Sequence, residues 1–292
     1  MYTGVWSRRF VKAVRGEGGQ MTRRDLRRYE PVLGEILRLR YRNHEIHLPG
    51  APATGGEYIQ TILGHIAPHD MAGDGYYQRS ADSLFHLARA IREFWLAEVA
   101  TAQRATDHTD SVVVVDEEGN VAAAQYSIYT RLWGTTGIFV EGVSVGDTAA
   151  TNQRMIEETG PGNLLPNPGN ALVAFRNGRP ALATASIGSG LIGVTAQALV
   201  DLIDYRLSPK KAQFSPTVRR PDFSLPGDPV RVTAGRFADD LLDAVRGMGV
   251  PIVEEPRGQE DAVGYWSGLI IQPDGLMSAA TSNAFNGWAE GY

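Results

Sequence analysis

A glycine-rich segment offers the first group of residues that could do chemistry. Gly188, Gly190 and Gly193 follow a predicted strand and open a predicted helix. The spacing Gly-x-Gly-x-x-Gly is that of a dinucleotide site, but such a site also needs an acidic residue at the end of a second strand about twenty residues later. Asp201 and Asp204 fall inside the predicted helix instead. The backbone N–H groups at this helix start are free to bind an anion or an oxyanion, which is the interpretation we favour.

Metal chemistry has little support in the sequence. His44 and His47 would point to opposite faces of a strand, and Pro68 breaks the helix that His65 and His69 would need to share. No carboxylate cluster completes either pair, so we predict no metal site and no cofactor. The chain has no cysteine, which excludes disulfides, thiolate metal sites and cysteine nucleophiles.

A hydroxyl residue, Thr109, precedes a run of four valines at positions 112–115. Such a β-branched run is typical of a strand buried on both faces, and the segment 116–120 supplies the turn that ends it. A second strand pattern occupies residues 121–128. The sequence therefore predicts a central hairpin with Thr109 at the N-terminal end of its first strand. Threonine is also common at strand starts, so position alone assigns it no role.

Composition narrows the class of protein. The chain has 292 residues, a formal net charge of −5 and a pI near 5.7. This charge does not indicate a protein that binds nucleic acid. The arginines of the cluster 23–28 are interleaved with other residues, so we interpret the cluster as a solvated helix face rather than as a phosphate contact. No apolar run reaches the length of a membrane span, and residues 1–9 lack signal-peptide order, so we expect a cytoplasmic protein without membrane contact.

The remaining elements position these residues. Helical spacing occurs at residues 4–15, 57–66, 80–102, 194–205 and 237–247, with a short capped helix at 22–29. Strand patterns occur at 33–41, 44–48, 172–175, 181–186, 251–254, 266–272 and 276–280, and Asn177-Gly178 predicts a tight hairpin turn. Residues 148–170 are polar and predict a long surface loop. The mixed order favours a layered α+β fold over a doubly wound sheet.

Several ordered motifs resemble the γ-glutamyltransferase family. Residues 18–29 resemble its Gly-Gly-x-(Met/Ile)-Thr-x-x-Asp-Leu-x-x-Tyr segment, and Thr54-Gly55-Gly56 resembles its Ser-Gly-Gly. Residues 109–120 fall where the family has Thr-Thr-His, Val-Val-Asp and Gly-Asn, while Asp204-Tyr205 and residues 289–292 also match. The resemblance covers nearly the whole chain.

The resemblance implies an N-terminal-nucleophile (Ntn) hydrolase, a four-layer αββα sandwich whose precursor cleaves itself before a threonine. Here the cleaved bond would join His108 to Thr109. The freed α-amino group of Thr109 would act as general base for its own hydroxyl, which would attack an amide carbonyl and form an acyl-enzyme. By the same resemblance, Gly188 and Ser189 would supply oxyanion contacts, and Ser127 would contact the nucleophile.

The chain departs from the family where substrate is held. Tyr129 replaces an asparagine, Asn167-Pro168 replaces paired serines, and residues 142–159 lack the family's Asn-Asn-Gln-Met-x-x-Asp loop. The terminal Asp-Pro-Arg is replaced by residues 281–283. A pocket that selects by polar pairs rejects a substrate whose partners are missing, so we expect a substrate other than glutathione. Either Arg131 or Arg154 could supply a new carboxylate contact, although a surface arginine is the preferred interpretation of each. The residues predicted to bind substrate are Tyr129, Arg131, Trp133 and Asn167.

Family precursors are roughly twice this length, so the resemblance assigns residues 1–108 to the end of the large-subunit region and residues 109–292 to the small catalytic subunit, within one joint domain. The sandwich would be incomplete without a first half. The chain is then a fragment, the partner of a separately encoded first half, or a reduced version that is unstable alone. The predicted partners are an amide or peptide-like small molecule and either a complementary large-subunit portion or further copies of the chain in a homo-oligomer. The predicted function is a self-processing threonine hydrolase or acyltransferase acting on an amide-like bond of a small molecule. The alternative is a non-catalytic subunit or decayed paralogue that pairs with the missing half.

Overall fold

The computed structural model describes residues 2–98, 109–127, 136–146, 152–188, 190–255, 264–282 and 287–291. The expected helices form close to their predicted bounds, and three short ones join them. The helices are α1 (Val5–Gly16), α2 (Arg23–Arg28), α3 (Gly55–Ile66), α4 (Met71–Asp74), α5 (Ala81–Glu98), α7 (Gln153–Thr159), α8 (Leu191–Ile203), α9 (Pro209–Gln213) and α10 (Asp239–Gly247). Within the described residues no helix is both long and apolar enough to cross a bilayer.

The strands of the described residues form one large sheet and smaller ones. The large sheet is six-stranded and antiparallel throughout, in the order β1 (Ile36–Tyr41), β2 (His44–Pro49), β7 (Leu172–Arg176), β8 (Arg179–Ile187), β12 (Tyr265–Ile271) and β13 (Met277–Thr281). The predicted central hairpin forms a separate sheet from β3 (Thr109–Val115) and β4 (Val121–Ser127). The small sheets comprise β5 (Phe139–Val140) with β6 (Val143–Ser144), and β9 (Val218–Pro221), β10 (Val230–Val232) and β11 (Ile252–Glu254).

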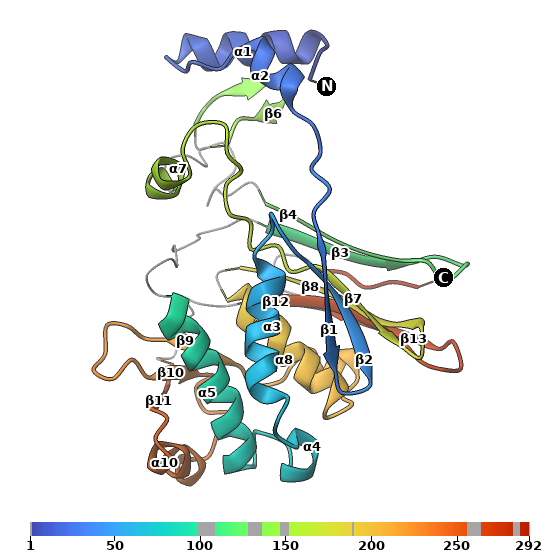
Figure 1. Cartoon of the computed structure of the whole chain (residues 1–292), viewed down its shortest axis with the longest axis vertical. Helices are drawn as coiled ribbons and strands as arrows, with labels where there is room; N and C mark the ends of the chain where they lie inside the picture. Colours follow the sequence, from blue (N-terminus) through green and yellow to red (C-terminus); the bar gives the residue numbers. More distant parts are fainter. Residues whose placement is uncertain are drawn as a thin grey trace.

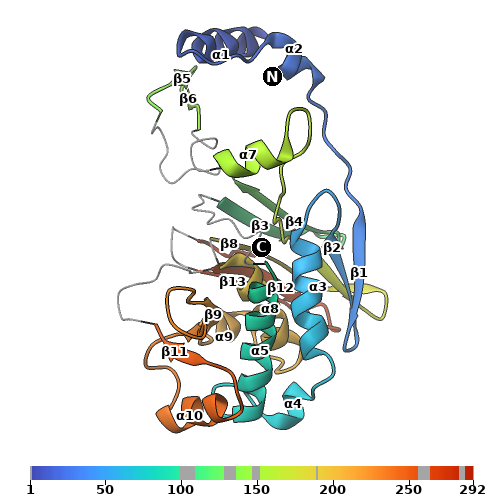
Figure 2. The same cartoon turned by 60° about the vertical axis from the view of Figure 1, so that its left-hand side comes forward.

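Helices, large sheet and hairpin form successive layers (Figure 1). Helices α3 and α8 pack on one face of the large sheet, and β3 and β4 pack on the other, mainly against β8 and β12. This is an α+β fold, and the four-layer αββα sandwich stays a prediction, because the described residues stack one helix layer on two sheet layers. Among the described residues no helix covers the outer face of the hairpin. In both views α1 and α2 lie apart from the large sheet, beside β5 and β6 (Figure 2), where the Trp6 indole donates a hydrogen bond to the Val140 carbonyl.

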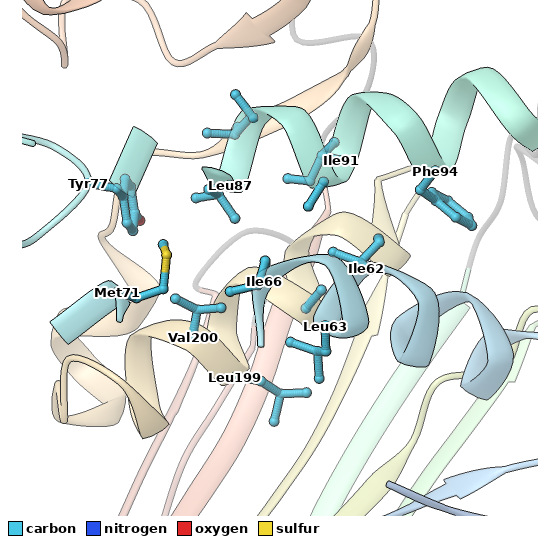
Figure 3. Packing of buried hydrophobic residues seen from close by; sticks show 14 of the residues in the cluster. Ile62, Leu63, Ile66, Met71, Tyr77, Leu87, Ile91, Phe94, Leu199 and Val200 are labelled. Carbon is cyan, nitrogen blue, oxygen red and sulfur yellow. The ribbon is translucent and has the colours of Figure 1, made fainter. Parts of the chain in front are cut away.

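The core lies between the helices and the large sheet. Ile62 and Ile66 of α3 meet Leu87 and Ile91 of α5, and Leu199 of α8 lies beneath them (Figure 3). All of these side chains are fully buried, and burial of each aliphatic side chain contributes about 1.5–3 kcal/mol. The same cluster extends from Tyr41 to Ile252, so residues on both sides of position 108 share one core.

Three expectations need correction. The valine run is not buried on both faces, because Val112 and Val114 are 54% and 51% exposed and nothing in the described chain covers them. The predicted loop 148–170 contains α7 within its described part. The sequence analysis expected no strand between residues 205 and 237, where β9 and β10 form, because their three or four residues are too few to show a periodicity.

Two adjacent glycines at the start of α3 each lie against a different backbone segment. The Thr54 N–H donates to the carbonyl of Asn167 at 2.9 Å. A Cβ atom on Gly55 would lie 2.1 Å from the carbonyl oxygen of Gly169, and one on Gly56 would lie 2.1 Å from that of Pro49. Only glycine permits this approach of backbone to backbone, so Gly55 allows the segment 167–169 to lie against α3, and Gly56 allows the end of β2 to do so.

A buried carboxyl lies on the helix side of the large sheet. Asp201 of α8 is 1% exposed and accepts a hydrogen bond from the Tyr77 hydroxyl at 3.5 Å. Burial raises the pKa of this carboxyl well above its ordinary value of 3.8, with a smaller contribution from Asp204. We infer that Asp201 is protonated in the folded chain at pH values where the unfolded chain has lost that proton.

Replacing Gly55 tests the backbone contact. Gly55→Ala should lower the free energy of unfolding by about 1–3 kcal/mol or more, because the backbone must move to admit the methyl group. Gly64→Ala, in the same helix and with nothing within 4 Å of its added Cβ, should instead raise it by about 0.5–1 kcal/mol. Urea unfolding measures both, and equal effects of the two substitutions would contradict the contact.

Replacing Asp201 tests its protonation. Above pH 3.8 the Asp201 carboxyl of the folded chain keeps a proton that the unfolded chain has released. The free energy of unfolding of the parent therefore falls as pH rises above this value. Asp201→Asn lacks this titration, and its stability relative to the parent should increase with pH, by at most about 1.4 kcal/mol per unit. Urea unfolding from pH 4 to 8 measures the trend. The exposed control Asp243→Asn should show no such increase, and a constant difference for Asp201→Asn would refute the inference.

Candidate active site

Thr109 begins β3 and lies opposite Ser127, the last residue of β4. Its hydroxyl donates a hydrogen bond to the Ser127 hydroxyl oxygen at 3.0 Å. Thr109 is 8% exposed, so the hydroxyl is held in a largely dry environment. In the intact chain its nitrogen belongs to a peptide bond, and only cleavage of the bond between residues 108 and 109 would turn it into an amine able to accept a proton.

The glycine-rich segment forms the predicted strand–turn–helix. Strand β8 ends at Ile187, Gly188 adopts a positive φ of 87°, and α8 begins one residue after Gly190. Helix starts of this kind carry backbone N–H groups without helical partners, which suit a developing negative charge. The neighbours of β8 are both antiparallel to it, whereas a dinucleotide site needs a parallel βαβ unit. The antiparallel pairing argues against a dinucleotide site, and the oxyanion role stays a prediction.

The hydroxyl pair and the glycine turn lie at the same end of the two stacked sheets. The β3–β4 turn and the β7–β8 turn extend to the same side of the molecule (Figure 1). The opposite ends of those strands therefore carry Thr109 and Ser127 on the hairpin and Gly188 on the large sheet. The Ser111 and Ser267 hydroxyls, 2.8 Å apart, join the two layers near this end.

Asn167 belongs to the segment 167–169, which lies against Gly55 at the start of α3. It is exposed, and its side-chain oxygen accepts a hydrogen bond from the Gly169 N–H at 3.0 Å. The role of Asn167 in substrate binding stays a prediction. Arg154 lies on the exposed face of α7, where Glu158 pairs with it at 2.6 Å. His108, Tyr129, Arg131, Trp133 and Ser189 lie outside the described residues.

Polar residues that the sequence analysis did not single out connect the two layers. The Gln125 side chain donates to the carbonyl of Ser186 at 2.8 Å and accepts from the N–H of Asn170 at 2.9 Å. The Asn170 side chain binds both the N–H and the carbonyl of Ser186, at 2.7 and 3.0 Å. One feature of the sequence could have indicated a role for Gln125. It is a long polar residue at an inward position of a strand that otherwise consists of small or apolar residues.

The histidines do not form a metal centre in the part of the chain that the structure describes. There, no three His, Asp or Glu side chains gather closely enough to hold an ion. His65 pairs with Glu93 at 3.2 Å, and the rings of His69 and His86 stack at 3.4 Å. His44 is buried, and burial lowers its pKa.

Comparison with known proteins supports the family resemblance. Residues 1–99 match the gamma-glutamyltranspeptidase family model. The chain is 25% identical to the acylase ACY 1 proenzyme of Pseudomonas sp. strain SE83 and 23% identical to the glutathione hydrolase proenzyme of Escherichia coli strain K12. Each alignment covers 96% of this chain and 56% of the relative, so the chain spans little more than half the length of these proteins.

The fold agrees with this relationship. The crystal structure of cephalosporin acylase from Bacillus halodurans superposes on the whole chain with a TM-score of 0.71 and 17% identity, and the match covers 60% of that protein. At this identity the likeness concerns the fold alone. The sequence matches make the chain similar to the gamma-glutamyltranspeptidase family, and the structural likeness agrees with a shared fold.

Proposed function

We propose that the chain is the catalytic part of a self-processing hydrolase or acyltransferase that uses Thr109 as its nucleophile. The hydrogen bond from the Thr109 hydroxyl to Ser127, at the end of the stacked sheets that also carries Gly188, is the observation that supports this function most directly. Both curated relatives are named as proenzymes and as an acylase or a hydrolase, which agrees with chemistry that follows cleavage of a precursor.

Self-processing would begin with attack of the Thr109 hydroxyl oxygen on the carbonyl carbon of residue 108. The peptide C–N bond breaks as the ester forms, and the Thr109 nitrogen takes the proton and becomes an amine. Water then hydrolyses the ester, which leaves a carboxylate on residue 108 and a free α-amino group on Thr109. Ser127 would hold the hydroxyl in the orientation that attack requires.

Turnover would use the same groups on an external amide. The α-amino group takes the hydroxyl proton as the oxygen attacks, and backbone N–H groups at Gly188 and Ser189 would stabilise the oxyanion. The leaving amine departs with the proton, and water or a second amine then takes the acyl group from Thr109. We propose a small acyl amide other than glutathione as substrate. The departures from the family's substrate-binding motifs at residues 142–159, 167–168 and 281–283 support this choice.

A second part of the proposal concerns the exposed face of the hairpin. Val112, Val114 and Tyr126 are 54%, 51% and 64% exposed there, and within the described residues β3 and β4 pair only with each other. An apolar sheet face with two open edges is a strong site for further strands. We propose that a polypeptide corresponding to the rest of the relatives' length covers it, as a complementary large-subunit portion.

The nucleophile is tested by cleavage. Denaturing electrophoresis with intact mass should show two fragments whose junction precedes Thr109. Thr109→Ala should slow this cleavage by about 10³-fold or more, whereas Thr109→Ser should retain slower cleavage because it keeps the hydroxyl. Thr61→Ala, which removes an exposed hydroxyl from α3, should cleave like the parent. A single uncleaved chain with activity unaffected by Thr109→Ala would refute the proposal and favour a non-catalytic subunit.

The partner is tested by co-expression with a candidate first half. The two polypeptides should co-purify as a one-to-one complex. Val114→Glu should raise the dissociation constant of this complex by about tenfold or more, because the carboxylate would lose its hydration in the interface. Phe214→Glu, an equally exposed residue at the end of α9 on the helix side, should have little effect. Equal affinities for Val114→Glu and the parent would exclude this face as the interface.

A further inference from the structure

Two side-chain amides and one backbone residue form a closed set of hydrogen bonds beneath Thr109 and Ser127. We name this set, Gln125, Asn170 and Ser186, the amide clamp. Gln125 belongs to the hairpin, Ser186 to β8 of the large sheet, and Asn170 to the segment just before β7. The clamp therefore joins the hairpin to the end of the β7–β8 strand pair.

Asn170 extends the large sheet with its side chain. The ladder between β7 and β8 ends with Leu172 opposite Thr184, and the same register continued would place Asn170 opposite Ser186. The Asn170 amide accepts from the Ser186 N–H at 2.7 Å and donates to the Ser186 carbonyl at 3.0 Å, as a backbone unit would. Both residues are fully buried, so these bonds act without competition from solvent.

Gln125 connects this extended ladder to the hairpin. Its side-chain NH₂ must face the Ser186 carbonyl, and its oxygen must face the Asn170 N–H, because backbone groups allow one role each. The two orientations therefore follow from the partners. Thr195 of α8 donates to the Ser186 hydroxyl oxygen at 2.8 Å and fixes the same strand from the helix side.

The clamp lies next to the groups that the proposed reaction uses. Gln125 is two residues before Ser127, so both side chains point to the same face of β4. Ser186 is two residues before Gly188 at the end of β8. The neighbouring side chains of β4 that face the large sheet, Ala123 and Val121, are short. Their packing alone would do little to prevent the hairpin from shifting along the large sheet, whereas hydrogen bonds are directional.

We propose that Gln125 is a positioning residue. It fixes the position of the hairpin, and so of Thr109 and Ser127, relative to the glycine turn at Gly188, and Asn170 supplies the second hydrogen-bonding partner that this role requires. The role rests on the proposed function, since the groups positioned are its nucleophile and its oxyanion contact. A displacement of about 1 Å between reacting groups can cost about 10²-fold in rate, so loss of the clamp should appear in the chemical step.

The first test follows self-cleavage before Thr109 by intact mass after a pulse of cell-free synthesis. Gln125→Met keeps the length of the side chain and removes its amide, and it should cleave about 10- to 100-fold more slowly. Gln125→Glu can still accept from Asn170 but donates to Ser186 only when protonated. Its rate relative to the parent should therefore rise as pH falls, since a partly buried carboxyl beside a carbonyl has a raised pKa.

A matched control is available in the same hairpin. Asn120→Ala removes the side-chain hydrogen bond to Asp116 at the distant turn and should cleave at the parent's rate. Cleavage of Gln125→Met within twofold of the parent, or a pH-independent ratio for Gln125→Glu, would overturn the proposal.

Hydrogen exchange separates this inference from the proposed function, because it requires no cleavage. In Thr109→Ala as background, Gln125→Met should speed exchange of amides in segments 125–127 and 186–188 and leave segment 113–117 unchanged. Uniform loss of protection along the hairpin would show a merely structural role and would overturn the inference. If the parent does not cleave, the proposed function fails, and this exchange pattern alone decides whether the clamp positions the two segments.

Discussion

The contact between the β3–β4 hairpin and the six-stranded sheet is the constraint on which the candidate site depends. Neither layer carries a complete set of groups: the hairpin contributes Thr109 and Ser127, and the large sheet contributes the turn at Gly188. Two stacked sheets share no backbone hydrogen bonds with each other, so side chains alone determine their relative position. Here the contacts near the site are polar, through Ser111 with Ser267 and through the amide clamp. Directional contacts suit a site that requires groups from two layers to meet accurately.

Local signals in the sequence predicted most elements correctly. The capping box of Thr22 and Asp25 and the positive φ values of Asn177 and Gly178 arise from neighbouring residues alone. The resemblance suggested Thr109, Ser127 and Gly188 as site residues, and the structure brings the first two into contact and places the third at the same end of the stack. The amide clamp could not be predicted from the sequence, because its members are separated by 45 and 16 residues and no local pattern joins them.

The motif glycines have different physical roles. Gly188 adopts a positive φ that admits the turn from strand to helix. Gly55 and Gly56 have ordinary helical positions, and they are required by the carbonyls of Gly169 and Pro49 that lie against them. Gly55 also acts at a distance from the proposed chemistry. It lies against Gly169, the next residue is Asn170, and Asn170 binds both Ser186 and Gln125. Consecutive contacts thus link Gly55 to Gln125, which lies two residues before Ser127.

The failed expectation of a doubly buried valine strand bears on what the chain is part of. The inference from four consecutive valines assumed a sheet with both faces covered. In the described chain the inner face of the hairpin is covered by the large sheet and the outer face is open. The inner face carries Thr109, Ser111, Gln125 and Ser127 together with the half-buried valines 113, 115 and 121, while the outer face carries Val112, Val114 and Tyr126 beside the exposed Asp110. Three exposed apolar side chains on one sheet face are more than a solvated surface needs, and such patches often mark interaction sites. This exposed face is the structural basis of the proposed complementary portion.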